Sequence, residues 1–192
     1  MNLALARAAI EALIFSSQEP ITVNTISDAV SLSDHTVRQL LLDLIEDYRV
    51  AKRGIQIVEM AGGYVFLTHP ECAGYIEKLQ RTPRSVPLSQ AALETLAIVA
   101  YRQPITRAEI ESLRGVKGES ALATLVEKGL IQEVGRRDSP GRPILYGTTR
   151  SFLKYFGLKN LNDLPSLEDW HVMAKPIKEV TKADEKDLQA GT

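Results

Sequence analysis

The sequence has little of the residue types from which most catalytic and metal sites are built. It contains one cysteine, Cys72, and three histidines among 192 residues. A single cysteine excludes an internal disulfide and a cysteine-rich zinc cage. His35, His69 and His171 have no cysteine or carboxylate at metal-ligand spacing. We therefore expect no metal, no cofactor and no catalytic residue, and an enzyme assembled from distant segments stays open only as a third alternative.

Long apolar runs are absent as well. No stretch approaches the roughly 20 apolar residues that a membrane helix requires. The first helical stretch contains Arg7 and Glu11, which the apolar region of a secretory signal would lack. These absences predict a cytoplasmic protein with no membrane partner. The remaining composition, 44% hydrophobic and 24% charged, is ordinary for a globular chain.

Charge is distributed unevenly along the chain, although the net charge is only −1. Residues 1–80 carry 6 basic and 10 acidic side chains, residues 81–160 carry 13 and 7, and residues 161–192 carry 4 and 7. An asymmetry of this kind is informative about binding partners rather than about the fold.

The stretch from Leu88 to Phe156 predicts a helix, a short helix, a third helix and a β-hairpin. In the first helix four apolar residues recur at helical spacing: Leu93, Leu96, Ala97 and Ala100. Pro104 ends that helix, because proline cannot continue the hydrogen-bond ladder. Two β-prone runs, residues 130–134 and 144–146, flank a loop with Pro140-Gly141, and this loop is the candidate wing of a winged-helix domain.

Local signals set the helix boundaries in this stretch. Thr106 and Glu109 have the spacing of a capping box at the start of the second helix, which we expect to stop near Gly115. Gly129 is free to take the left-handed conformation that closes the third helix, and Leu130 is then placed to pack on Leu125. That third helix presents Leu122, Leu125 and Val126 as its predicted core residues.

The same order precedes this stretch: helices at 3–17 and 24–30, a third after the N-cap Ser33, and a hairpin over 55–67. Pro20-Ile21-Thr22 recurs as Pro104-Ile105-Thr106, and Ile14 and Ile26 match Ile98 and Ile110, all displaced by 84 residues. The sequence thus predicts a mainly helical α+β protein with two tandem winged-helix domains, residues 1–80 and 88–167. Residues 81–87 are the predicted linker and 168–192 a disordered, charged tail.

A winged-helix pattern raises the hypothesis of DNA binding, since the third helix of this fold commonly enters the major groove. Here the third helices are acidic, which disfavours contact with a polyanion. The second candidate wing is basic, with Arg136, Arg137 and Arg142. These arginines could contact phosphate, form a solvated loop or bind an acidic protein partner. A winged-helix DNA-binding transcriptional regulator is therefore the alternative function.

Several stretches closely resemble the segregation and condensation protein B family. They are residues 88–110, Arg114-Gly-Val116, Gly141-Arg-Pro143, Tyr146-Gly-Thr-Thr149, residues 152–158 and Leu161-Asn-Asp-Leu-Pro165. The resemblance implies a non-catalytic accessory subunit of bacterial condensin that acts in chromosome condensation and segregation during cell division. It also implies a cytoplasmic, nucleoid-associated location.

The resemblance further implies the partners. It predicts a homodimer formed largely through the first domain, for which Leu5, Leu13 and Leu41 are the candidate apolar residues. It predicts binding of the second domain to ScpA, the bacterial kleisin, and through ScpA a connection to the structural-maintenance-of-chromosomes (SMC) ATPase. Direct contact with DNA is expected to be weak or indirect.

Overall fold

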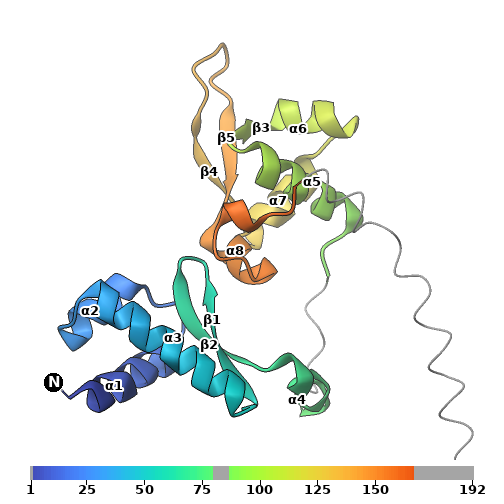
Figure 1. The fold of residues 1–192 in the computed structure, drawn as a ribbon. Coiled ribbons are helices and arrows are strands. Elements are labelled where there is room, and N and C mark those ends of the chain that lie inside the picture. The colour runs from blue at the N-terminus through green and yellow to red at the C-terminus, as the bar shows by residue number, and fades with distance from the viewer. Residues whose placement is uncertain (1, 80–86, 167–192) are drawn as a thin grey trace, which may run out of the picture. The chain divides into compact units, whose positions relative to one another are not determined.

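The computed structural model of the chain describes residues 2–79 and 87–166 (Figure 1). The predicted tail and all of the predicted linker except Pro87 lie outside the described residues. The fold contains both helices and sheets. The order of three helices followed by an antiparallel hairpin occurs twice along the chain. We call residues 3–79 the first module and residues 90–156 the second module.

The first module begins with three helices, α1 (Leu3–Ser16), α2 (Val23–Val30) and α3 (Asp34–Val50). The hairpin of β1 (Ile55–Met60) and β2 (Gly63–Thr68) follows, and η1 (Pro70–Cys72) and α4 (Ala73–Leu79) end the module. The N-cap predicted at Ser33 is confirmed, because its hydroxyl accepts the Thr36 N–H at 3.2 Å.

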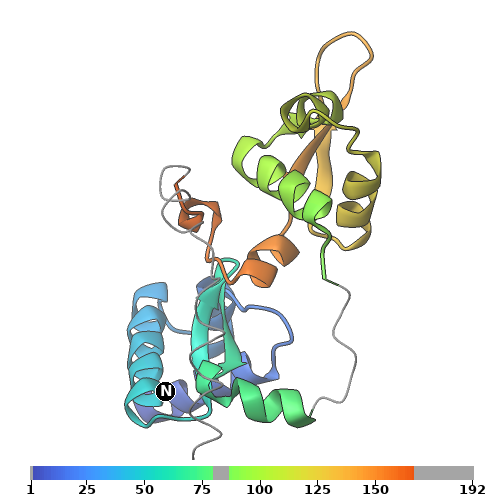
Figure 2. The ribbon, with the colours of Figure 1, turned by 90° about the vertical axis from the view of Figure 1, so that its right-hand side faces the viewer.

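The helices and the hairpin of the first module, drawn as a ribbon in Figure 2, share one apolar core. Its largest fully buried side chains are Ile10, Ile14, Ile26, Val37 and Leu41. They come from all three helices, which explains why the helices pack together: burying each such side chain contributes roughly 1.5–3 kcal/mol.

The second module consists of α5 (Gln90–Arg102), β3 (Ile105–Thr106), α6 (Arg107–Arg114), α7 (Glu119–Glu127), β4 (Ile131–Arg136), β5 (Ile144–Thr148) and α8 (Arg150–Phe156). The short helix η2 (Leu161–Asp163) follows. Strand β3, which the sequence analysis did not predict, pairs with β5 and extends the hairpin to three strands in the order β3-β5-β4.

Both predicted helix boundaries of the second module are confirmed. The Glu109 N–H donates to the Thr106 hydroxyl at 3.4 Å, and the Thr106 N–H donates to the Glu109 carboxylate at 2.9 Å, which completes the capping box. Gly129 has a φ of +65° and the Leu130 N–H donates to the Leu125 carbonyl at 3.0 Å. This is the Schellman ending of α7.

The repeat displaced by 84 residues holds at the Pro-Ile-Thr motif but not in the helix that precedes it. Thr22 and Thr106 each cap the following helix. Ile14 is fully buried, however, whereas Ile98 is only half-buried. The equivalent core positions are Ala6, Ile10 and Ile14 in α1 and Ala92, Leu96 and Ala100 in α5, displaced by 86. The match of Ile14 with Ile98 is therefore wrong, because three residues separate α1 from Pro20 and only one separates α5 from Pro104.

Several apolar side chains predicted to be in the core are exposed. On α5, Leu93 is 41% exposed and Ala97 is also exposed. Thr95 occupies the core instead, because its hydroxyl donates to the Ala91 carbonyl at 2.8 Å and needs no water. Val126 is exposed as well. Among the aromatic residues of α8, Phe152 is buried and Tyr155 and Phe156 are exposed.

Candidate partner-binding surfaces

The outward face of α1 carries no charge. Its exposed residues are Leu3, Ala4, Leu5, Ala8, Ala12, Phe15 and Ser16. The two charged residues of α1, Arg7 and Glu11, are half-buried and lie toward α3. Arg7 forms an ion pair with Asp47, and the Tyr48 hydroxyl donates to the Glu11 carboxylate.

This arrangement inverts the usual one for a surface helix, whose charged residues face water. Leu5 is 61% exposed and Phe15 is 75% exposed, and only alanine lies between them on the outward face. Continuous exposed apolar surface of this kind is typical of an interface with another protein chain. Leu5 is the one residue of this face that was expected at the dimer contact from the sequence, although the absence of charge at positions 3–5, 8, 12 and 15 was a readable signal.

The three candidate dimer residues have different environments. Leu5 lies on the outward face of α1, and Leu13 is half-buried against the core of its own module. Leu41 is completely buried in that core. Leu41 therefore offers no surface to a second copy, because helical spacing identifies a buried face but not the chain that buries it.

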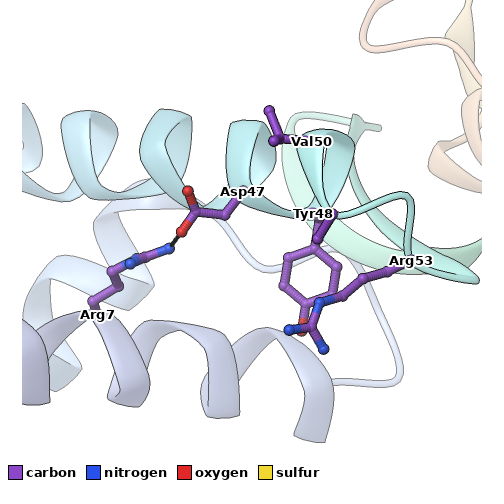
Figure 3. A pocket seen from close by; sticks show the side chains of 6 residues that line it. Arg7, Asp47, Tyr48, Val50 and Arg53 are labelled. Carbon is purple, nitrogen blue, oxygen red and sulfur yellow. Dashed lines mark hydrogen bonds and ion pairs between the residues drawn. The ribbon is translucent and has the colours of Figure 1, made fainter.

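A shallow cleft of about 360 Å³ lies at the seam between α1 and the end of α3 (Figure 3). Its lining residues are Arg7, Asp47, Tyr48, Val50, Ala51 and Arg53. The Arg53 guanidinium lies 5.3 Å from the centre of the Tyr48 ring, a cation–π contact. The hydrogen bond to Glu11 is the main reason that the pKa of Tyr48 is raised. The polar groups of the cleft already pair with one another or with Glu11, and these contacts hold α1 against the end of α3.

The arginines of the second hairpin are not one free basic patch. Arg137 donates to the Glu109 carboxylate at 2.7 Å. This contact, followed by the hydrogen bonds from Thr106, lowers the pKa of Glu109 from 4.5 to about 2. Arg136 donates to the main-chain carbonyl of Arg142 at 3.2 Å, and both side chains are exposed. Arg137 is thus neutralised, and Arg136 and Arg142 retain exposed charge.

The start of α7, which would lead into a DNA groove, is held in an ionic network. Arg107 donates to Glu111 at 2.9 Å and to Glu119 at 3.1 Å. The Gly118 N–H donates to Glu111 at 3.0 Å, and this hydrogen bond is the largest reason that the pKa of Glu111 is lowered. Two carboxylates share one guanidinium here, which disfavours a phosphate at this end of α7.

Exposed apolar residues of α5, of α6 and of the turn after α6 make up a second surface that was not expected from the sequence. Leu93, Leu113 and Val116 are all exposed. The Arg114 guanidinium, almost buried, donates to Glu94 at 3.2 Å and joins α5 to α6. We call these three apolar residues the α5–α6 surface.

Among residues 2–79 and 87–166 there is no helix with the length and apolar character to cross a membrane. The same part of the chain holds no group of three or more histidine, cysteine, aspartate or glutamate side chains arranged to bind a metal ion.

The sequence matches the family model described as segregation and condensation complex subunit ScpB over residues 8–167. The chain belongs to the ScpB family. The segregation and condensation protein B of Symbiobacterium thermophilum is 55% identical over 159 residues, 83% of this chain and 72% of that protein. The protein of the same name from Desulforamulus reducens is 48% identical over 171 residues, 89% of this chain and 94% of that protein.

A solved structure described as a dimer of the ScpB N-terminal domain complexed with ScpA peptide is also similar. It is 32% identical, covers 41% of this chain and 99% of that chain, and has a TM-score of 0.39. The ScpB family match itself includes residues 8–16 of α1, the rest of the first module and all of the second module.

Proposed function

We propose that this ScpB-family chain is a non-catalytic accessory subunit of a bacterial SMC–kleisin condensin. It acts at the nucleoid in the cytoplasm, in chromosome condensation and segregation during cell division. The proposal divides the chain into winged-helix domains at residues 1–80 and 88–167, with 81–87 as linker. Membership of a family described as a complex subunit supports this role. The single structural observation that carries it is the uncharged outward face of α1, which needs a protein partner.

A second copy of the chain is the proposed occupant of the α1 face. The face lacks charge along the whole helix, and a self-complementary apolar patch of this kind suits the isologous contact of a two-fold dimer. Leu3, Leu5 and Phe15 are its largest side chains. Burying each contributes about 1.5–3 kcal/mol, enough to make them the energetic centre of the contact.

The kleisin ScpA is the proposed partner of the second module, and the SMC ATPase is reached through ScpA. The α5–α6 surface supports this assignment, because Leu93 on α5, Leu113 on α6 and Val116 just after α6 are all exposed. An amphipathic segment of a partner can bury its apolar residues against such a surface. The ion pair between the almost buried Arg114 and the half-exposed Glu94 joins the two helices.

Specific DNA recognition is the competing function, favoured by the exposed charge of Arg136 and Arg142. A regulator would bind a preferred duplex sequence with an affinity that falls steeply with salt. We expect binding that is weak, salt-sensitive and independent of sequence. Tight sequence-selective binding by a chain that ignores ScpA would refute the accessory role.

Dimerisation is tested on the full chain by sedimentation equilibrium of Ala12→Glu and Phe15→Glu. Each variant places a carboxylate on the α1 face, where burying an unpaired charge is costly. We expect the dimer dissociation constant to rise at least about 100-fold, which corresponds to about 2.7 kcal/mol.

Tyr75→Glu is the matched control, because Tyr75 on α4 is 76% exposed and Phe15 is 75% exposed. We expect this variant to remain dimeric. Binding of purified ScpA to the same variants shows whether the α5–α6 surface acts independently of the dimer. A dissociation constant that does not change in Ala12→Glu and Phe15→Glu contradicts the assignment of the α1 face.

A further inference from the structure

The tip of the β1–β2 hairpin is apolar and buried, although hairpin tips are usually polar and exposed to water. Met60 is 7% exposed and Ala61 is 3% exposed. Neither belongs to the core cluster of the first module, which includes Ile57 and Tyr64 from the same hairpin. Another part of the chain must therefore cover the tip.

The turn at this tip breaks the residue preference of its type. Ala61 has a φ of +48° and Gly62 a φ of +74°, and positive φ at both central positions is the type I′ pattern. Asn-Gly, Asp-Gly and Gly-Gly are favoured in this turn, because alanine is strained at positive φ. Ala61 is nevertheless only 3% exposed, so an asparagine or aspartate side chain at this position would be buried away from water.

The segment from α8 to Lys159 supplies that contact. The Ala61 N–H donates to the Leu158 carbonyl at 2.9 Å, and the Gly62 N–H donates to the Lys159 carbonyl at 3.0 Å. The Arg150 guanidinium donates to the Ala61 carbonyl at 3.2 Å. The polar main-chain groups of a buried tip are thereby satisfied, as burial requires.

Two ion pairs flank these hydrogen bonds. Lys154 contacts both carboxylate oxygens of Glu19, at 2.7 and 2.8 Å. Lys159 lies 3.0 Å from the Glu59 carboxylate. Both lysines come from the basic half of the chain and both glutamates from the acidic half, so the charge asymmetry of the sequence is used here within one molecule.

We propose that the hairpin tip at residues 60–63 and the segment 150–159 form an intramolecular latch that holds the second module against the first. The latch consists of three hydrogen bonds and two partly exposed ion pairs. Contacts of this kind contribute little individually, so the latch is reversible and weakens as salt screens its charges. Its closed state fixes the angle at which the two modules present their partner surfaces.

The test measures the distance between the modules in the full chain. Spin labels are attached to Asn24→Cys and Gln132→Cys in a Cys72→Ser background, and labelled chain is diluted with unlabelled chain to suppress distances between protomers. We expect one narrow distance distribution for this parent protein at low salt. Raising the salt concentration adds a second, broader population.

Charge exchange then isolates the latch from general effects on folding. Lys154→Glu turns attraction to Glu19 into repulsion, and we expect the closed-to-open ratio to fall roughly 2- to 30-fold. The exchange Glu19→Lys with Lys154→Glu restores the narrow distribution. Lys128→Glu, which changes an exposed charge on the second module outside the latch, leaves it unchanged.

Either of two results overturns the proposal. One is a distribution in Lys154→Glu that equals that of the parent protein. The other is an exchange variant that stays as open as Lys154→Glu. Circular dichroism melts of each variant confirm that both modules are folded during the measurement.

Discussion

The carboxylate of Glu109 ties α6 to the second hairpin, and its removal gives the sharpest test of the electrostatics described above. One carboxylate oxygen accepts a hydrogen bond from Arg137 at 2.7 Å. The other accepts from the Thr106 N–H at 2.9 Å and from its hydroxyl at 2.8 Å. The perturbation is Glu109→Gln, which keeps an oxygen for the capping box and removes the charge that faces Arg137.

The expected loss of stability follows from the pKa of Glu109, which is lowered from 4.5 to about 2, chiefly by Arg137. At about 1.36 kcal/mol per pH unit, the upper bound is about 3.4 kcal/mol. The Glu109 side chain is 43% exposed, so water screens much of this interaction. We therefore expect Glu109→Gln to lower the free energy of unfolding by about 1 kcal/mol at pH 7.

The sign of the pH dependence is fixed, because the folded pKa lies below the unfolded one. The stabilisation is complete above pH 4.5 and is lost as the pH falls through about 2. At pH 3 the difference between wild type and Glu109→Gln is smaller than at pH 7, because the unfolded state then binds more protons than the folded state. Urea denaturation at pH 7 and pH 3 measures it, with Glu127→Gln on α7 as the exposed control. A difference that is equal at both pH values refutes the reasoning.

Two further predictions concern packing in the first module, measured by urea denaturation. Leu41→Ala lowers the free energy of unfolding by about 2–5 kcal/mol because Leu41 is fully buried, whereas Leu42→Ala, at an exposed position, changes it by less than about 0.5 kcal/mol; equal effects would contradict the core assignment. Gly63→Ala destabilises by about 1–3 kcal/mol, because its new methyl group would lie 2.8 Å from the backbone of Pro20. Gly74→Ala meets no atom within 4 Å in α4 and stabilises by about 0.5–1 kcal/mol; a destabilised Gly74→Ala or a neutral Gly63→Ala would count against this packing.

Local structure was predictable where a residue type has one dominant reason to occupy its position. Ser33 and the Thr106–Glu109 pair satisfy the free N–H groups of a helix start, and Gly129 takes a positive φ at a helix end. These signals depend only on neighbours within a few residues. They were therefore correct before any tertiary contact was known.

The candidate surfaces were less predictable, because they depend on which apolar face a module buries. Helical spacing placed Leu93 in the core, but Leu93 is 41% exposed; Leu41, a candidate dimer residue, is completely buried in its own module. Thr95 took a core position that its polarity argued against, since a hydrogen bond within α5 satisfies its hydroxyl. Likewise, the charge of Arg137 was readable, but its pairing with Glu109, 28 residues away in sequence, was not.

By itself the sequence determined the repeated order of helices and hairpin, the helix ends and the family, because periodicity, caps and motifs are properties of short stretches. Only the tertiary structure decided which charges are neutralised and which apolar residues stay exposed. Charged side chains of α1 pair with α3 and leave its outward face bare, and the strained Ala61 turn is covered by residues far along the chain. Burial and ion pairing depend on which residues lie close together in space, and a short stretch of sequence does not determine its distant neighbours.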